Sequence, residues 1–429
     1  MKSIAIIGGG ISGLAALHYL NQRFTNNVSI TLYECNAVVG GNVQSVMTDG
    51  FLFEKGPNGF LTNQPNTLAF LKELNLLDQT ITASYKAKRR YVQVNGQLNA
   101  FPLDPLSMIN FKPLSIGDKC RLLGELLQPK ADNSHETIHD FVTRRCGAAV
   151  ADYLVDPFVT GVFAGDSKLL HMASAFPKMA ALENNYGSLI KAMFLEPNNN
   201  KPVMTSLALG MGQVIEALSQ RYASQIKCGV TIQSLDEITS DHLIMTIPAY
   251  AASRLLLERS ATLAGLLDSI PYVPVAVVGV GIDIKALKKI PDGFGYLIPS
   301  NQHKEILGVL IESNVYVNRA PSNHVMFRVM MGGRHHPSII NDDPALLLNK
   351  ALATIDLSYG LIGKPVMTHV QLWPKAIPQY EKNYPRIRQG ITNEVSRMKG
   401  ISLAGNYLDG ISFNDTINNA KLIAQSITL

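Results

Sequence analysis

The sequence predicts a mixed α/β protein in which a βαβ unit opens the chain, a helical insertion follows, and a second domain is built around a sheet of its own. The length of 429 residues, at about 150 residues for a typical domain, allows two or three domains with substantial cores. The chain begins with a strand, a glycine-rich turn, a helix and a strand, and short apolar runs recur between residues 273 and 331. A hydrophobic fraction of 46% and a charged fraction of 17% exclude a disordered chain.

The opening unit consists of three segments. The apolar run Ile4–Ile7 is typical of a parallel strand that is buried on both faces. From Ser12 to Phe24 apolar residues recur at helical spacing, and Val28–Tyr33 then has the composition of a second strand. Because two parallel strands need a crossover between them, this order predicts a complete βαβ unit.

Three glycines lie between the first strand and the helix, in the pattern Gly8-x-Gly10-x-x-Gly13. Glycines at these positions allow a tight turn, let a pyrophosphate approach the backbone and let the helix pack closely on the sheet. Glu34 follows Gly13 by 21 residues, where a carboxylate accepts hydrogen bonds from an adenosine ribose. The pattern predicts a dinucleotide site, and Glu34 favours FAD or NAD over NADP because a carboxylate would repel a 2′-phosphate.

Two further glycine-rich turns follow Glu34, at Gly40–Asn42 and Gly56–Gly59. Backbone in such turns can support a second nucleotide half or an isoalloxazine ring. The same residues also suit plain hairpin turns around a strand at Phe51–Phe53. The two interpretations are compatible, and both stay open at this point.

The middle of the chain differs from its flanks. Residues 104–200 carry helical patterns, such as Thr137–Arg145 and Ser188–Phe194, interrupted by prolines, and therefore predict a helical insertion. Strands of a separate sheet are expected at three short runs bounded by turns, which are Val273–Ile284, Glu305–Ile311 and His324–Met331.

Charge and cysteine content narrow the classes of partner. Lys and Arg number 38 against 33 Asp and Glu, a formal charge of +5 that is too small to indicate nucleic acid but favours anionic substrates or lipids. Cys35, Cys120, Cys146 and Cys228 are widely separated, so we expect no disulfide framework, no thiolate metal site and a reducing compartment. No apolar run reaches the roughly 20 residues of a membrane span, and we expect no leader before Ile4, which together suggest a cytoplasmic protein.

One motif points to a different chemistry. His135-Glu136-Thr137-Ile138-His139 matches H-E-x-x-H, in which two histidines on one helical face hold zinc. The motif falls near an expected helix start and lacks a downstream third-ligand pattern. We therefore expect no metal there, and we interpret His335–His336 as a solvated turn before a proline.

Taken together, the first glycine motif and the two later glycine turns resemble the flavin amine oxidase superfamily. Further segments narrow the resemblance to the protoporphyrinogen oxidase family, and they follow the family's order from end to end. These segments are Arg90–Val92 leading to Gly96 and Phe101–Pro102, Gly161–Asp166, Gly293–Pro299, Trp373–Ala376 with Tyr380, and Leu403–Asn406. Gly161–Asp166 is the most specific of them.

The resemblance implies a Rossmann-like FAD-binding domain assembled from separated stretches, an α+β substrate-binding domain and a helical insertion that can rest on a membrane. On this basis we assign residues 1–80, 201–265 and 385–429 to the FAD-binding domain, 81–103 and 266–384 to the substrate-binding domain, and 104–200 to the insertion.

The resemblance also implies a substrate site. Arg90 would pair with a propionate, a role that suits the planar fork of a guanidinium, although a solvated basic strand end with Arg89 is the alternative. Apolar side chains would clamp the macrocycle and small residues would form a floor beneath it, and these are Leu297, Leu310 and Met330 for the clamp and Gly161 and Ala164 for the floor. Without the resemblance, the clamp residues would be expected in the core.

For FAD, the resemblance implies contacts along much of the chain. The residues concerned are Gly8, Gly9, Gly10, Ile11, Ser12 and Gly13 at the pyrophosphate, Glu34 at the ribose with Cys35 beside it, Gly41, Asn42, Gly56, Pro57, Asn58 and Gly59 towards the flavin, Val230 at the adenine, and Trp373, Gly405, Ile411, Ser412 and Phe413 near the isoalloxazine.

The implied reaction is hydride transfer from a porphyrinogen to the flavin, with oxygen as the final acceptor, and it needs no Ser, Cys or His nucleophile. Coproporphyrinogen is the rival substrate. Its four carboxylates would require more cations around the pocket than protoporphyrinogen does. An amine oxidase is disfavoured by Gly161–Asp166 and Gly293–Pro299. A non-catalytic carrier of the same fold, like the GDP dissociation inhibitors, is disfavoured by the intact glycines and Glu34.

Two further properties stay open in the sequence. Tyr186–Leu195 places Leu189, Ile190, Met193 and Phe194 beside a lysine, a pattern that suits a helix lying on the inner face of the cell membrane and suits equally a helix buried within the insertion. A homodimer is compatible with the sequence but is not indicated by any particular residue.

Overall fold

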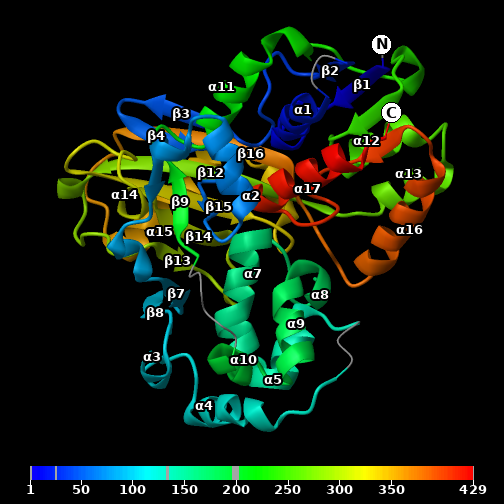
Figure 1. Cartoon of the computed structure of the whole chain (residues 1–429). Coiled ribbons are helices and arrows are strands. Elements are labelled where there is room, and N and C mark those ends of the chain that lie inside the picture. Colours follow the sequence, from blue (N-terminus) through cyan, green and yellow to red (C-terminus); the bar gives the residue numbers. More distant parts are fainter. Residues whose placement is uncertain (1, 25–26, 132–134, 196–201, 429) are drawn as a thin grey trace.

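The computed structural model describes residues 2–24, 27–131, 135–195 and 202–428. A parallel sheet with the first residues of the chain, a larger mixed sheet and a group of helices at the opposite end from the N-terminus can be followed in Figure 1. Expected polar stretches at 132–134 and 198–200, which flank helices of the insertion, lie outside the described residues.

The parallel sheet has five strands in the order β10-β2-β1-β11-β17. Their bounds are β1 Lys2–Ile7, β2 Val28–Tyr33, β10 Ile226–Lys227, β11 His242–Met245 and β17 Ile401–Leu403. The apolar residues of β1 are buried because helices cover both faces of the sheet, as expected for parallel strands. Since all five strands run in one direction, their carboxyl ends, including Gly8 after β1, meet at one edge of the sheet.

Helices from distant parts of the chain pack on this sheet. Helix α1 (Ile11–Phe24) connects β1 to β2, which confirms the predicted βαβ order, and it contacts α17 (Phe413–Ser426) near the C-terminus. Helices α2 (Pro65–Glu73) and α11 (Gly212–Arg221) complete the same core. A small sheet beside it pairs β5 (Phe60–Leu61), β9 (Met204–Leu207) and β6 (Thr80–Thr82).

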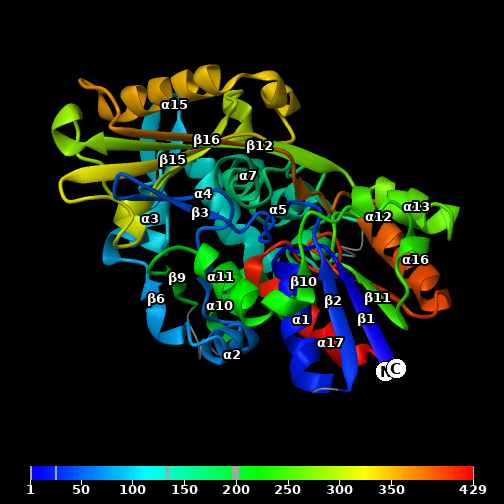
Figure 2. The ribbon, with the colours of Figure 1, turned by 90° about the horizontal axis from the view of Figure 1, so that it is seen from above.

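The mixed sheet has seven strands in the order β16-β12-β15-β14-β13-β7-β8. Their bounds are β7 Tyr91–Val94, β8 Gln97–Ala100, β12 Tyr272–Asp283, β13 Gly295–Leu297, β14 Ile306–Ile311, β15 His324–Gly332 and β16 Met367–Pro378. Helix α15 (Pro344–Tyr359) covers one face, as Figure 2 shows. On the other face Gly279 and Gly281 leave room for Phe53 and Phe51 of β4 (Phe51–Glu54), which forms a hairpin with β3 (Ser45–Thr48).

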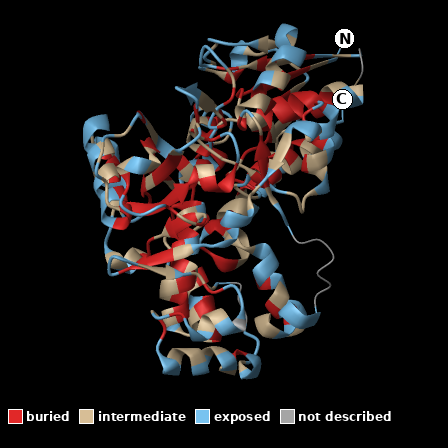
Figure 3. Cartoon of the chain, turned by 90° about the vertical axis from the view of Figure 1, so that its left-hand side faces the viewer, coloured by how far each residue is buried: buried red, intermediate tan, exposed pale blue. Residues whose placement is uncertain are grey.

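The insertion is helical, as predicted. It contains α3 Pro105–Ile109, α4 Ile116–Leu123, α5 Ile138–Cys146, α7 Asp156–Phe163, α8 Met172–Ala175, α9 Pro177–Tyr186 and α10 Leu189–Leu195. The helical pattern expected at Ser188–Phe194 is confirmed by α10, which follows Gly187, the left-handed residue that ends α9. The helices at the bottom of Figure 3 are mostly intermediate or exposed. Within the described ranges, none of the helices is both long enough and apolar enough to cross a membrane.

Candidate active site

Two glycine turns meet at the carboxyl edge of the parallel sheet. The Gly40 N–H donates to the Gly9 carbonyl at 2.8 Å, and Gly10 and Gly40 form an isolated parallel bridge. Gly41 has φ +56°, and a Cβ there would meet the Gly10 Cα at 3.2 Å. The first turn and the Gly40–Asn42 turn therefore form one surface, although 30 residues separate them in the chain.

The space above this surface fits the phosphates of a dinucleotide. A Cβ at Gly10 would meet no atom within 4 Å, whereas a Cβ at Gly13 would overlap the Gly8 carbonyl, so Gly13 serves packing and Gly10 faces open space. Ile11 and Ser12 begin α1, and the Ser12 hydroxyl is buried without a hydrogen-bond partner. A phosphate at the helix N-terminus would supply that partner and would interact favourably with the helix dipole.

Glu34 lies beside the same turns with its carboxylate 6% exposed. The carboxylate accepts hydrogen bonds from the Gly9 N–H at 2.6 Å and the Asn36 N–H at 2.9 Å, which orient it. The Val230 N–H donates to the Glu34 carbonyl at 2.9 Å, so the expected adenine and ribose residues are adjacent. Burial and the neighbouring Glu34 charge raise the pKa of Cys35, which is therefore a neutral thiol at neutral pH.

A cavity of about 380 Å³ opens between the two sheets. Two of the expected cofactor residues line it, Asn42 and Trp373, and the other lining residues are Pro248, Tyr250, Tyr272, Pro374, Lys375, Ala376 and Asn406. The Lys375 ammonium lies over the Tyr250 ring, 4.2 Å from its centre. Sequence reasoning missed Tyr250, Tyr272 and Lys375 as site residues; of these, only Lys375 lay in a quoted family segment.

The Gly56–Gly59 turn lies under this region and is held from the side of the mixed sheet. The Trp373 indole N–H donates to the Lys55 carbonyl at 2.9 Å, and the Arg328 guanidinium donates to the Gly56 carbonyl. Gly56 packs so tightly on the Asn42 carbonyl that any side chain would overlap it. The turn is thus fixed against both the Gly40–Asn42 turn and the strands β15 and β16.

The remaining expected cofactor residues lie around the start of α17. Ser412 caps this helix, since its hydroxyl accepts from the Asp415 N–H at 3.1 Å. Phe413 is buried against Phe60 with ring centres 5.9 Å apart, so its side chain belongs to the core. Gly405 has φ +151° and Ile411 is half-buried in the same loop region. Any contact of these residues with the flavin stays a prediction.

The expected clamp residues share one face of the mixed sheet. Leu297 pairs with Gly308, Gly308 pairs with Met330, and Leu310 pairs with Arg328, so directly opposed side chains point the same way. Trp373 lies on the same face through its pairing with Val275. This is the face opposite α15, and it is directed at the flavin side of the molecule.

The floor residues approach this face from the insertion. A Cβ at Gly161, in α7, would lie 2.8 Å from a terminal methyl of Leu297, so a larger residue there would require Leu297 to shift. Ala164 ends α7 in the left-handed conformation at φ +48°, and its carbonyl accepts from the Arg334 N–H at 2.8 Å. None of the six expected substrate residues lines the 380 Å³ cavity, which lies nearer to β16.

Arg90 immediately precedes β7, the strand next to β13. Its guanidinium lies over the Phe294 ring at 5.0 Å, and partial burial lowers its pKa. Arg89 pairs with Asp292 at 2.6 Å, whereas no acidic side chain among the described residues pairs with Arg90. The two neighbouring arginines therefore differ in their ion pairing, and Arg90 is the one whose guanidinium is available to bind an anion.

The H-E-x-x-H segment is not arranged as a zinc site. His135 precedes α5 and lies in a turn, Thr137 caps the helix, and His139 lies within it, so the two histidines do not share a helical face. Glu136 pairs with Arg144 at 2.7 Å, and His139 pairs with Asp152 at 3.1 Å.

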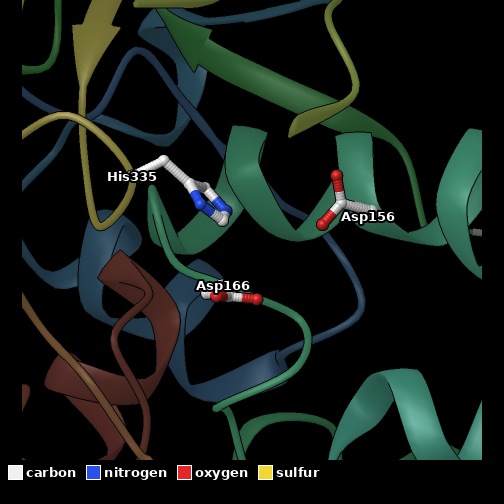
Figure 4. A group of neighbouring side chains, drawn as sticks. All are labelled: Asp156, Asp166 and His335. Atoms are coloured by element: carbon white, nitrogen blue, oxygen red, sulfur yellow. The ribbon is translucent and has the colours of Figure 1, made fainter. Parts of the chain in front are cut away.

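A different group brings together Asp156, Asp166 and His335, whose donor atoms lie within 4.8 Å of one another. Figure 4 shows the three side chains between α7 and the loop after β15. Asp156 already accepts from the Ser167 hydroxyl and the Ser300 N–H, both at 2.8 Å. Because these bonds tie three segments together, we interpret the group as structural.

Comparison with known proteins agrees with this geometry. Residues 11–428 match the family model described as flavin containing amine oxidoreductase. Protoporphyrinogen oxidase 1, chloroplastic, of Arabidopsis thaliana is 30% identical, over 97% of this chain and 86% of that protein. Coproporphyrinogen III oxidase of Bacillus subtilis is 25% identical, over 98% of this chain and 96% of its own length. A crystal structure from Exiguobacterium, assigned as a protoporphyrinogen oxidase, has a TM-score of 0.86 at 21% identity and covers 99% of this chain and 98% of that one.

The residues described above fit a flavin dinucleotide. Open space at Gly10, the unpartnered Ser12 hydroxyl and the oriented Glu34 carboxylate suit its phosphates and ribose. FAD is the cofactor of this protein, and the protein is an oxidoreductase. The chain belongs to the family of flavin-containing amine oxidoreductases.

Proposed function

We propose that this protein oxidises protoporphyrinogen IX to protoporphyrin IX in porphyrin biosynthesis, with FAD as cofactor and oxygen as the final electron acceptor. The observation that carries the proposal is the end-to-end similarity to protoporphyrinogen oxidases, such as the Arabidopsis enzyme at 30% identity over 97% of this chain. The apolar face of the mixed sheet beside the flavin turns supports it, because a large apolar macrocycle needs such a wall.

Bound FAD would supply the two-electron chemistry by accepting hydride from the substrate. The chain's own residues then have three tasks. Leu297, Leu310 and Met330 form an apolar wall on one side of the substrate, and Gly161 of α7 lets the insertion pack directly against Leu297. These residues would orient the substrate and exclude water from it. Orientation of this kind can account for a large part of the lowering of an activation barrier.

Arg90 would bind one propionate of the substrate. A guanidinium without a carboxylate partner, held over the Phe294 ring, keeps its hydrogen-bond donors available for an incoming carboxylate. Arg89 cannot replace it, since its guanidinium already pairs with Asp292.

Coproporphyrinogen III is the second candidate substrate. The Bacillus subtilis coproporphyrinogen III oxidase matches almost its entire length against this chain, so length does not separate the two. A tetracarboxylate would require additional unpaired cations near the site. Lys375, which lies over the Tyr250 ring in the cavity, is one such cation.

The test is turnover of both porphyrinogens by the purified holoenzyme, followed by porphyrin fluorescence. We expect protoporphyrinogen to have the higher kcat/KM, and a large preference for coproporphyrinogen would overturn our first choice. Arg90→Met should raise KM about tenfold with little change in kcat, because the lost contact binds ground and transition states alike. Arg89→Met is the matched control and should leave KM unchanged.

We also propose a peripheral membrane contact through the insertion, on the cytoplasmic side. Its outer helices expose a set of large apolar side chains, which are Leu106, Ile109, Ile116, Leu123, Leu127, Met193, Phe194 and Leu195. Such a surface suits the headgroup boundary of a bilayer and would collect an apolar substrate. Flotation with anionic liposomes tests it: Leu106→Ser with Leu127→Ser should lower binding, and equal binding of both proteins would remove the proposal.

A further inference from the structure

Four charged side chains are buried directly behind the Gly56–Gly59 turn. They come from β4, the start of α14 (Glu312–Val315), the loop after it, and β15. Their exposed fractions are 1% for Glu54, 2% for Glu312, 0% for Arg319 and 6% for Arg328, and we call them, with Tyr316, the turn cluster. Charges so deeply buried are costly, so their arrangement calls for a physical reason.

The oppositely charged groups of the turn cluster are too far apart to form short hydrogen-bonded ion pairs. Arg319 lies 3.8 Å from Glu54, and Arg328 lies 3.5 Å from Glu312, both longer than the 2.7–2.9 Å of a charge-assisted hydrogen bond. Several of its buried polar atoms have no hydrogen-bond partner among the described residues, namely Glu312 Oε2, the Tyr316 hydroxyl, Arg319 Nε and Nη1, and Arg328 Nε. Each such atom costs about 1–3 kcal/mol unless it is hydrogen-bonded. A cluster built only for stability would pair them.

Two of these side chains instead form hydrogen bonds with the turn. Arg328 donates to the Gly56 carbonyl, and Glu312 accepts from the Asn58 side chain at 3.1 Å. The Tyr316 hydroxyl lies so close to Gly59 that a side chain at that position would overlap it. Gly56 and Asn58 are therefore each held by a charged side chain, whereas Glu54 accepts from the Ser45 hydroxyl and the Met211 N–H, and Arg319 donates to Ser206 and to the Leu207 carbonyl.

The strand that carries Arg328 also carries Met330, two residues along the same face. A movement of the turn relative to β15 would thus change the distance between the flavin side and the expected substrate wall. Arg328 and Glu312 have opposite charges, lie on different elements, and meet at this junction between the two halves of the molecule.

We propose that Arg328 and Glu312 are positioning residues that fix the Gly56–Asn58 turn against bound FAD and set the local charge that the flavin experiences. Neither residue was expected to have a role from the sequence. The inference rests on the FAD site and not on the identity of the substrate, so it can be tested without a porphyrinogen.

The experiment measures the two-electron reduction potential and the absorption spectrum of FAD in Glu312→Gln and Arg328→Met holoenzymes. Glu312→Gln keeps the shape but leaves Arg328 uncompensated, which favours electron uptake by the flavin. Arg328→Met leaves Glu312 uncompensated and disfavours it. We expect the equilibrium constant for flavin reduction to rise about tenfold in the first and to fall about tenfold in the second, each about 30 mV for two electrons.

Opposite shifts, together with a potential near the original in the double variant, support the proposal, because loss of a purely structural contact would move both variants the same way. Shifts in the same direction, or both within twofold of the unchanged protein, would overturn it. If Arg328→Met does not fold, Glu312→Gln decides alone, with an unchanged or lower potential counting against the proposal. Arg397→Met and Glu394→Gln, which break an ion pair on α16 (Tyr384–Arg397), are matched controls with no expected shift.

Discussion

Two groups of buried charged side chains in this molecule differ in how fully their members are paired and hydrogen-bonded. In the insertion, Arg145 and Glu125 are fully buried, and the ion pairs of Arg145 are short: its Nε donates to Glu125 at 2.8 Å and its Nη1 donates to Glu183 at 3.0 Å. We call these residues, with Arg144 and Glu136, the insertion cluster. In the turn cluster the ion pairs lie at 3.5 and 3.8 Å, and several polar atoms lack partners.

The difference shows what each cluster is for. Glu125 also accepts from the Ser188 hydroxyl and from the Leu189 N–H at 2.9 Å, so it caps α10 while pairing with Arg145. A closed network of this kind joins α5, α9 and α10 into one body. The turn cluster leaves its own groups unsatisfied and holds a loop instead, which is the pattern expected where function rather than stability selects the arrangement.

The largest expected effect is at the centre of the insertion cluster. Arg145→Met removes one partner of a buried pair and leaves Glu125 and Glu183 uncompensated, at a cost of about 3–5 kcal/mol in the free energy of unfolding. Urea denaturation followed by circular dichroism measures it. The exposed pair variant Arg397→Met should lose under about 0.5 kcal/mol. A loss below about 1 kcal/mol for Arg145→Met would remove the distinction between the two clusters.

Two substitutions that each remove one hydroxyl test the same comparison, with smaller expected changes in the free energy of unfolding. Ser188→Ala removes a bond to Glu125 and the first-turn cap of α10, and should cost about 1–2 kcal/mol. Tyr316→Phe removes a buried hydroxyl that has no partner, so its unfolding free energy should stay within about 0.5 kcal/mol or rise. Equal losses in the two variants would mean that the Tyr316 hydroxyl is satisfied after all.

The smallest expected effect is on how the stability of the protein depends on pH, and the two clusters change this dependence in opposite directions. Burial by itself would raise the pKa of Glu125, but hydrogen bonds from Ser188, Leu189 and Arg145 outweigh it and lower the pKa below the ordinary 4.5. The stabilisation is then complete above pH 4.5 and is lost as the pH falls through the lowered pKa. Burial raises the pKa of Glu54 above 4.5, so its ionisation reduces stability as the pH rises through that value.

Denaturation midpoints between pH 3 and 8, at saturating FAD, separate these contributions. Relative to the unchanged protein, Glu125→Gln should flatten the acid limb below pH 4.5, while Glu54→Gln should gain stability as the pH rises above 4.5. Parallel curves for all three proteins would contradict both assignments.

The local parts of the fold could be predicted from the sequence. The βαβ unit is confirmed with boundaries close to those expected, because a buried strand and an amphipathic helix each have a period that is visible in consecutive residues. The helix expected at Ser188–Phe194 is found as α10, and Gly187 ends the preceding helix. In the H-E-x-x-H segment Thr137 caps α5, so the motif begins in the turn before the helix, as expected from its position near a helix start.

Much of the candidate site could not be predicted from residue patterns alone. The contact between Arg328 and Gly56 joins positions 272 residues apart, and the one between Trp373 and Lys55 joins positions 318 apart. No periodicity in the chain encodes such pairs. The family resemblance supplied Trp373, but Arg328 and Glu312 lie outside its quoted segments and are identified only by the packing of the two halves.

The most direct test of the whole account is anaerobic mixing of the oxidised holoenzyme with protoporphyrinogen IX. We expect the flavin absorbance band to disappear as the porphyrin product forms, and we expect admission of oxygen to restore the band. A flavin that dithionite reduces but protoporphyrinogen leaves oxidised would contradict it.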